Sequence, residues 1–242
     1  MHDDLAPHYD ELFDDLYDVS FICATHALLE ILENLRAPPA RVLDVGAGTG
    51  RIALPLVEAG YAVTAVEPSR GMRERLIEKA ADERRHIELR AGVVPDALLP
   101  TDLGFDLALL AFGVIDYIVD DAAAEAALRA IAARMSPDGL CVVQPAPKHF
   151  MRSGVELGTH YRREVEVRWT GDVAAVKHRV LKDEQQVAVE DLQMRYRSPD
   201  ALRPLVARAG WQVREEKTDG LYPTWVLELA PVAAPRGIAA VP

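Results

Sequence analysis

Cysteine and positive charge are both scarce in this sequence. Among its 242 residues there are only two cysteines, Cys23 and Cys141, which lie far apart in apolar surroundings. So few thiols argue against a disulfide framework or a zinc cluster, and we expect no metal site. Lys and Arg number 27 against 38 Asp and Glu, which gives a net charge of −11. Without a basic face the chain is poorly suited to nucleic acid, whose phosphates require cations.

Long hydrophobic runs are absent as well. No apolar stretch reaches the roughly 18 residues that a membrane span requires, and the first residues lack the order of a signal peptide. We therefore expect a cytoplasmic protein that does not enter a membrane. Half of the residues are hydrophobic and 27% are charged, which is typical of a chain with a sizeable core. The length predicts one large domain with a small appendage, or two small domains.

The first 20 residues contain seven acids and no Lys or Arg. They also hold Tyr9, Phe13 and Tyr17 at intervals of four, which places the three rings on one side of a helix. We expect a solvated acidic helix that docks through these rings. The run from Phe21 to Leu35 continues with a helical apolar stripe, which ends at Ala-Pro-Pro, residues 37–39.

From residue 41 onward, strands alternate with helices. The expected strands are 41–45, 61–66, 87–90, 105–110 and 140–144, and the expected helices are 51–59, 69–81 and 121–135. This alternation predicts a mostly parallel, doubly wound sheet. In the helix at 69–81 we expect Met72, Leu76 and Ile77 to face inward.

Beyond residue 160 the apolar residues recur with a period of two. Segments 161–169, 173–181 and 187–196, joined by short polar turns, predict an antiparallel three-stranded meander. Ser-Pro-Asp at 198–200 then marks the start of a helix that runs to Gly210. The last expected strands are 211–216 and 224–230, followed by a loose tail rich in Ala and Pro.

A glycine-rich loop follows the first strand, with the sequence Asp-Val-Gly-Ala-Gly-Thr-Gly at 44–50. Glycines there allow a sharp turn and a close approach to a ligand, beside the free N–H groups of a helix start. Glu67 ends the next strand 21 residues after Gly46, a spacing that suits a carboxylate holding ribose hydroxyls. Dinucleotide sites and S-adenosylmethionine (SAM) sites share these features.

Two details favour SAM. The glycines follow the pattern GxGxG, whereas the dinucleotide pattern GxGxxG would place a glycine at Arg51. Asp44 would repel a pyrophosphate but attract the amino group of a methionine moiety, and SAM also carries a sulfonium cation. A nicotinamide-dependent oxidoreductase, or a nucleotide-binding module without chemistry, is the alternative from another class.

The motifs VLDVGAGTGR at 42–51 and VTAVEPS at 63–69 resemble the class I SAM-dependent methyltransferases, over roughly residues 40–145. The resemblance implies a Rossmann-like α/β fold with a seven-stranded sheet whose last strand pair is antiparallel. It also places Asp44, Gly46 and Gly48 near the methionine end of SAM, Glu67 on the ribose, and Pro68 and Met72 at the adenine. The family often has an Asp after the glycine that follows strand three, where this sequence has Gly-Val-Val at 92–94.

A narrower similarity is to small-molecule methyltransferases, especially amino-sugar and antibiotic-pathway N-methyltransferases. It rests on Tyr9-Asp10, Tyr17-Asp18, the segment 112–117 and the inserted meander. It implies an N-terminal helical lid at 1–36, a SAM-binding core at 37–147, a meander at 148–197 that builds an acceptor pocket or dimer contact, a C-terminal part of the core at 198–230 and a tail at 231–242. The full set of expected cofactor-binding residues is Tyr9, Tyr17, Asp44, Gly46, Ala47, Gly48, Arg51, Glu67, Pro68, Met72, Gly92, Val93, Val94, Ala111, Phe112 and Tyr117.

The expected reaction is an in-line methyl transfer to a nitrogen or oxygen of a small-molecule metabolite. The enzyme's main contribution is then alignment, and a base is needed only when the acceptor must lose a proton. Segments after strands four and five reach the site, and we take His149 as the candidate base and Tyr17 as a second catalytic candidate. A peptide, protein or RNA acceptor is the alternative within the class, and the acidic chain disfavours RNA. The exposed edge of the meander suggests a homodimer.

Overall fold

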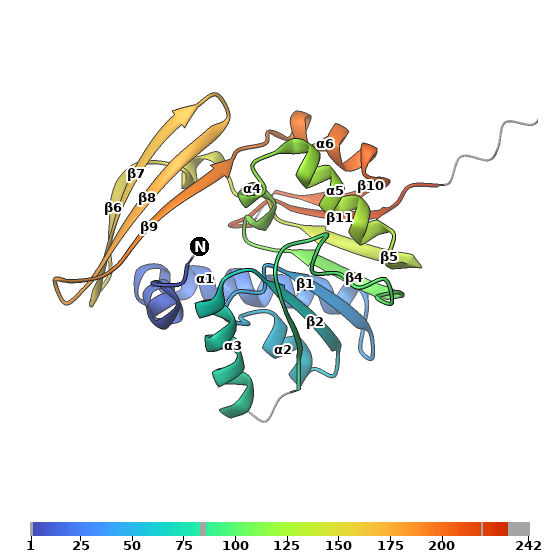
Figure 1. The fold of residues 1–242 in the computed structure, drawn as a ribbon, viewed down its shortest axis with the longest axis horizontal. Coiled ribbons are helices and arrows are strands. Elements are labelled where there is room, and N and C mark those ends of the chain that lie inside the picture. The colour runs from blue at the N-terminus through green and yellow to red at the C-terminus, as the bar shows by residue number, and fades with distance from the viewer. Residues whose placement is uncertain (1, 83–85, 219, 232–242) are drawn as a thin grey trace, which may run out of the picture.

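The computed structural model describes residues 2–82, 86–218 and 220–231. Two sheets dominate it, a large twisted one and a four-stranded antiparallel one that stands to its side (Figure 1). The large sheet has seven strands in the order β10-β11-β5-β4-β1-β2-β3. Its strands are β1 (Arg41–Val45), β2 (Ala62–Glu67), β3 (Glu88–Ala91), β4 (Phe105–Leu110), β5 (Met135–Val143), β10 (Trp211–Lys217) and β11 (Thr224–Leu229).

Strands β1 to β5 pair in parallel, whereas β11 runs antiparallel to both β5 and β10. The expected seven-stranded sheet with an antiparallel last pair is therefore confirmed. Its helices are α1 (Tyr9–Leu35), α2 (Ala53–Glu58), α3 (Arg70–Asp82), α4 (Val114–Tyr117), α5 (Asp121–Ala132) and α6 (Pro199–Arg208), with 3-10 turns η1 (Ala6–His8) and η2 (Lys148–Phe150). None of the helices in the described part of the chain is long and apolar enough to cross a membrane.

Helices cover both faces of the large sheet, which explains why its central strands are apolar throughout. Leu128 of α5 and Leu205 of α6 pack on the face that carries Leu43. Leu32 of α1 and Leu56 of α2 pack on the opposite face. The α/β layering thus follows from strands that bury residues on both sides.

Helix α6 begins as expected, because the Ser198 side chain accepts a hydrogen bond from the N–H of Ala201. Helix α5, by contrast, ends at Ala132 rather than Met135. Residues 136–139 belong to β5, where the register slips between Phe105 and Leu107 of β4. A bulge of this kind tolerates Pro137 and Gly139, residue types that otherwise tend to end helices.

Two single-residue expectations were wrong. Ile77 is 56% exposed, whereas Met72 and Leu76 are buried. Ile77 lies five residues after Met72, which rotates its side chain about 140° away from the buried stripe. Cys23 is exposed on α1, while Cys141 is buried in β5, so only one of the two cysteines lies in apolar surroundings.

The inserted meander has four strands, not three: β6 (Gly154–Leu157), β7 (Tyr161–Thr170), β8 (Val173–Lys182) and β9 (Gln185–Arg195), paired in that order. Strand β6 was not predicted, because it lacks a buried apolar face: Val155 and Leu157 are exposed, at 60% and 71%. Asp183 and Glu184 turn the chain from β8 into β9, both with positive φ, as a two-residue hairpin turn requires.

Helix α1 joins the two sheets. Its C-terminal half packs against the large sheet, and its first half lies beside the meander (Figure 1). There Leu12 packs with Tyr161 and Val180. Asp15 forms one of the polar contacts: its carboxylate accepts the backbone N–H groups of residues 159, 160 and 161, at 3.0, 2.9 and 2.7 Å. This side chain therefore helps to fix the β6–β7 turn against the helix.

Asp15→Ala is expected to lower the free energy of unfolding by about 1–3 kcal/mol, because three N–H groups lose their acceptor. Burial opposes ionisation of Asp15, but the three hydrogen bonds hold its pKa below the ordinary value. The stabilisation is thus present above about pH 4 and is lost as the pH falls through the lowered pKa. Urea unfolding near neutral pH measures the loss. The control is Asp138→Ala, whose side chain is 77% exposed and should cost less than about 1 kcal/mol; equal losses would contradict this role for Asp15.

Candidate functional site

A cavity of about 340 Å³ opens at the carboxyl ends of β1, β2 and β4, the edge at which open α/β sheets bind ligands. Segments far apart in the sequence meet there: the N-terminus, the glycine-rich loop, the β2–α3 turn and the segment after β4. The described residues that line it are His2, Tyr9, Asp44, Val45, Gly46, Ala47, Gly48, Thr49, Arg51, Ile52, Val66, Glu67, Pro68, Met72, Gly92, Val93, Val94, Ala111, Phe112, Val114, Tyr117, Ile118 and Ala123.

The glycine-rich loop forms the floor of the cavity. Gly46, Gly48 and Gly50 all have positive φ, at 74°, 57° and 86°, a conformation that favours glycine. The N–H of Gly46 bonds to the carbonyl of Val66 on β2 at 2.8 Å, which anchors the start of the turn. A Cβ at Gly48 would meet no atom within 4 Å, so the backbone there faces open space that a ligand can enter.

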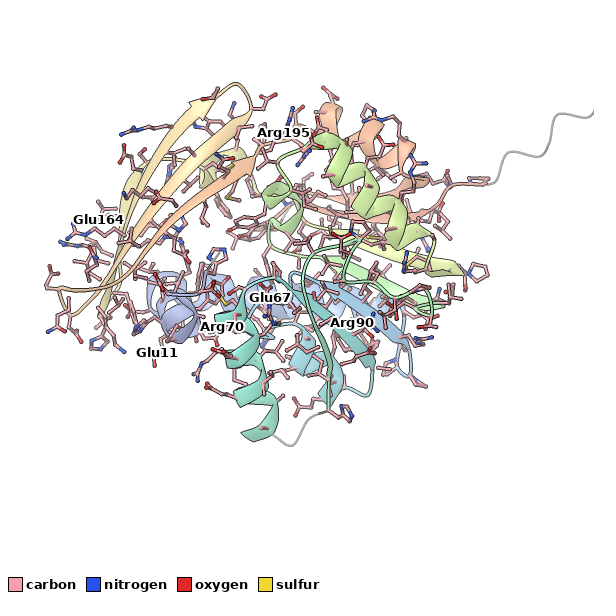
Figure 2. The ribbon with its side chains drawn as sticks, in the orientation of Figure 1. Glu11, Glu67, Arg70, Arg90, Glu164 and Arg195 are labelled. Carbon is pink, nitrogen blue, oxygen red and sulfur yellow. The ribbon has the colours of Figure 1, made fainter. Side chains whose placement is uncertain are left out.

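Two buried carboxyl groups, Asp44 and Glu67, flank this loop at 3% and 6% exposure. Glu67 lies where β2 leads toward α3 (Figure 2), and its oxygens accept the N–H groups of Ser69 and Gly48 at 2.8 and 2.9 Å. Burial raises the pKa of Glu67, and these two bonds oppose the rise. Glu67 therefore shapes the loop, and each of its oxygens keeps a lone pair for a further donor.

Asp44 is not satisfied. Its buried Oδ2 has no hydrogen-bond partner among the described residues. Burial, and then the charge of Glu67, raise the pKa of Asp44 to about 7. A buried carboxyl without a partner is costly for the free protein, and a cation placed beside Oδ2 would remove that cost. The ammonium group of a methionine moiety has the required charge and donors.

The far wall is less polar. Pro68 and Met72 line it together with Gly92, Val93 and Val94. Because 92–94 carries no polar side chain, this wall offers backbone groups and apolar surface to a ligand. Such a surface suits a flat ring better than a charged group.

Aromatic side chains enclose the opposite end of the cavity. Tyr9 comes from α1, Tyr117 from α4 and Phe112 from the turn after β4. The N–H of Phe112 bonds to Oε1 of Gln144, 3.3 Å away, and the amide of Gln144 bonds in turn to Thr224 of β11. Phe112 has a positive φ of 52°, so this chain of hydrogen bonds holds it in an unusual conformation.

Asp116 lies on α4 beside Tyr117, at the same end of the cavity. It is fully buried, and its Oδ2 accepts the N–H of Ala146 at 2.6 Å. Burial raises the pKa of Asp116 to about 7, against the lowering effects of this bond and of Arg197. Arg197 is also buried and donates to the carbonyls of Ile115 and Ile118, which fixes the helix that carries Tyr117.

The cavity brings together all the residues expected to bind the cofactor except Tyr17. Tyr17 lies two turns after Tyr9 on α1, and the rise of about 12 Å carries it beyond the cavity wall. Its hydroxyl donates to Glu156 of β6 at 2.7 Å and accepts from Arg163 of β7. Tyr17 thus contacts the meander. The contacts that the lining residues make with a cofactor stay predictions.

His149, the expected base, is also outside the cavity. It lies exposed in the turn η2, and its ring contacts the edge of Phe150 at 4.7 Å. No motif in the sequence points to His2, yet this residue lines the cavity. Other lining residues that sequence reasoning missed are Val45, Thr49, Ile52, Val66, Val114, Ile118 and Ala123.

The N-terminal segment is fixed over the cavity by acidic residues. Asp3 accepts the Ser69 hydroxyl and the Gly71 N–H, both at 2.8 Å, and the bonds to Gly71 and then Ser69 hold its pKa below the usual range. Asp10 accepts the Thr49 hydroxyl at 2.7 Å and pairs with Lys79 at 3.0 Å. The acids that the sequence suggested as a solvated face include these anchoring groups.

Gly71→Ala is expected to release the N-terminal segment. A Cβ there would lie 2.8 Å from the Asp3 carbonyl and 3.0 Å from the Ala6 Cβ, although alanine is otherwise the better helix former. We expect SAM affinity to fall about tenfold and limited proteolysis to cut the N-terminal segment sooner. Gly154→Ala, with nothing within 4 Å of its Cβ, is the control. Unchanged affinity in Gly71→Ala would show that the segment does not need this close contact.

Comparison with known proteins points to one class of enzyme. A family model described as "Methyltransferase domain" matches residues 21–216. Cypemycin N-terminal methyltransferase from a Streptomyces species is 31% identical over 150 residues, which cover 60% of this chain and 60% of that protein's length. The match therefore spans about three fifths of that relative.

Two solved structures share the fold. A SAM-dependent methyltransferase from Clostridium acetobutylicum aligns with a TM-score of 0.80 at 14% identity, over 94% of this chain and 100% of that one. An amino pentose methyltransferase of calicheamicin biosynthesis from Micromonospora echinaspora aligns with a TM-score of 0.71 at 19% identity, over 92% and 96%. At these identities the likeness establishes the fold.

Proposed function

The chain belongs to the class I SAM-dependent methyltransferases, and we propose that it transfers the methyl group of SAM to a nitrogen atom of a small molecule. The observation that carries this proposal is the partnerless Oδ2 of Asp44, buried beside the glycine-rich loop. A buried anion in that place favours a ligand with a cationic end. A pyrophosphate would instead bring two negative charges against it.

The residues present fit SAM. Asp44 would accept hydrogen bonds from its ammonium group, Glu67 would hold the ribose, and Pro68 and Met72 would pack on the adenine. When bound, SAM supplies a methyl group on a positively charged sulfur, which needs no further activation. The chain's own contribution is to align an acceptor within the cavity and to exclude water from it.

The acceptor would enter between the large sheet and the meander. Tyr9, Phe112 and Tyr117 line that end, and Phe112 also contacts the ring of Tyr222 edge-on at 5.3 Å. Aromatic walls suit a compact acceptor that stacks or packs on them. A nitrogen acceptor is supported by two similar proteins, cypemycin N-terminal methyltransferase and a sugar N-methyltransferase of solved structure.

Calorimetric titration of the full chain with SAM, NAD and NADP is the first test. We expect micromolar SAM binding and no heat from either nicotinamide. Transfer is then followed by mass spectrometry with three probes: glucosamine as an amino sugar, trialanine as a peptide amine and galactose as a hydroxyl compound. We expect one added methyl group on an amine probe and none on galactose. Nicotinamide binding without SAM binding would overturn the assignment, and methylation of galactose alone would overturn the choice of nitrogen.

A further inference from the structure

A buried histidine–carboxylate pair lies at the acceptor end of the cavity, outside any motif. Nδ1 of His2 is 2.8 Å from Oε2 of Glu190 on β9, and the two side chains are only 17% and 5% exposed. The second oxygen of Glu190, Oε1, is buried without a partner among the described residues. The carboxylate of Glu190 therefore bonds to the ring of His2, and His2 is one of the residues that line the cavity.

Hydrogen bonds of the backbone and of the next residue hold His2 in this place. Its carbonyl accepts the N–H of Ala6 at 2.9 Å, and the next residue, Asp3, is fixed to Ser69 and Gly71. His2 has a positive φ of 61°, a conformation that costs energy for a residue with a Cβ and that recurs at functional sites. Its ring also meets Tyr117 edge-on at 5.6 Å.

The carboxylate partner determines which ring nitrogen of His2 carries the hydrogen. A carboxylate oxygen only accepts hydrogen bonds, so Nδ1 of His2 must carry the hydrogen, and in the neutral ring Nε2 then keeps its lone pair. We propose that His2 is the general base that takes a proton from the acceptor nitrogen, and that Glu190 is the residue that positions its ring. This inference rests on the proposed function and names a residue that deepens it.

The step is a simple proton transfer. A primary amine acceptor arrives as an ammonium ion, whose nitrogen has no lone pair to attack with. Nε2 of His2 accepts one proton, so an acceptor N–H bond breaks and an Nε2–H bond forms, which leaves the lone pair on the acceptor. That lone pair forms the new N–C bond as the C–S bond breaks, and sulfur keeps the electron pair. Glu190 stabilises the imidazolium until its proton passes to solvent.

The groups around His2 support this assignment over a second histidine nearby. His178 on β8 is the register partner of Glu190, but burial, and then the charge of Arg163, lower its pKa to about 3. A base so weak holds no proton near neutral pH. Tyr9 on α1, Tyr117 on α4 and Glu67 on β2 also lie near this space, and burial raises the pKa of each, so the tyrosines stay neutral. Asp44 and Arg51 line the same cavity, and Arg163 of β7 lies close to both tyrosines.

The first test needs no acceptor. The ring nitrogens of ¹⁵N-histidine are observed by NMR in the full chain, with His2 assigned from the spectrum of His2→Gln. We expect the hydrogen on Nδ1 and an unprotonated Nε2 in the neutral ring. Glu190→Leu should lose this preference, whereas Glu190→Gln should keep it because its amide oxygen still accepts. A ring with its hydrogen on Nε2 in the wild-type chain would overturn the inference.

The second test measures transfer to glucosamine and trialanine. His2→Ala is expected to lower kcat by about 10² or more, while the Kd for SAM changes far less. Added imidazole should restore part of the rate, which a loss of packing alone would not allow. Glu190→Leu should also lower kcat, and Glu190→Gln should do so less. The matched control is His160→Ala, because His160 forms an exposed pair with Asp183 at 3.1 Å, remote from the cavity lining.

The outcomes separate the two proposals. If the wild-type chain methylates an amine probe and His2→Ala keeps its rate, His2 is not the base although the proposed function holds. If SAM binds and neither amine is methylated, the nitrogen assignment fails, and the ring spectrum still decides whether Glu190 sets the tautomer of His2. If imidazole does not rescue a slow His2→Ala, the ring acts by packing and the inference is overturned.

Discussion

Asp44→Asn should abolish tight SAM binding and at the same time stabilise the free protein above pH 7. The carboxyl group is 3% exposed and its Oδ2 lacks a partner among the described residues. Removing its charge removes the attraction for the ligand's ammonium group, and loss of a charged hydrogen bond costs about 1.5–3 kcal/mol or more, which is at least tenfold in Kd. The free protein, however, no longer buries an anion.

The sign of the pH dependence follows from the raised pKa. Burial and Glu67 raise the pKa of Asp44 to about 7, so the folded protein holds a proton that the unfolded chain has already released. Stability of the free protein is therefore lost as the pH rises from about 4 to 7, by on the order of 4 kcal/mol at most. SAM prefers the ionised carboxylate, so its affinity should rise as the pH approaches about 7.

Thermal unfolding and calorimetric titration on either side of pH 7 measure both effects. Above pH 7 the wild-type chain should unfold at a lower temperature than the variant. Only the wild type should bind SAM tightly at that pH. A variant that binds SAM as well as the wild type would remove Asp44 from the site. A variant that melts lower than the wild type would show that Asp44 is stabilising in the free protein.

Gly46→Ala and Gly48→Ala are expected to differ in their effects on stability and on SAM binding, although both residues have positive φ. A Cβ at Gly46 would lie 2.5 and 3.0 Å from the two methyl groups of Val114. Overpacking of about 1–3 kcal/mol then adds to a backbone strain of about 1–2 kcal/mol. A Cβ at Gly48 meets nothing within 4 Å, so only the strain applies in the free protein, but the methyl group would stand where the cofactor is expected.

Urea unfolding and SAM titration of the two variants separate the effects. Gly46→Ala should lose several kcal/mol of stability, and it should bind SAM weakly because Val114 lines the cavity. Gly48→Ala should unfold close to the wild-type midpoint and yet lose SAM affinity by at least tenfold. Equal stability of the two variants would show that Val114 moves aside at little cost. Full SAM affinity in Gly48→Ala would place the cofactor away from this loop.

The large sheet and the glycine-rich loop could be predicted because their signals are local. Strands buried on both faces are apolar throughout, as β4 and β5 are, and turns between them carry glycine and proline. The loop at 46–50 follows β1, and Glu67 ends the next strand of the same βαβ unit. The number of residues between them therefore predicts that they lie close together. The cofactor end of the cavity follows from these elements.

Elements whose signals depend on distant partners were missed. Strand β6 is short and exposed, so its sequence resembles a loop, and it becomes a strand only by pairing with β7. Residues 136–139 resemble a helix stop because the bulge that accommodates them depends on β4. Tyr17 and Tyr9 look equivalent in sequence, but helix α1 carries Tyr17 to the meander while Tyr9 lines the cavity.

The sequence by itself determined the α/β class, the succession of core strands along the chain and the residues that surround the glycine-rich loop, because each rests on signals within a few tens of residues. Only the tertiary structure decided the acceptor end. His2 and Glu190 are separated by 188 residues and meet because Asp3 fixes the N-terminus to α3 while β9 returns the meander over the cavity. No periodicity or motif records a contact between two such segments, since its geometry is set by how the two sheets and α1 pack together.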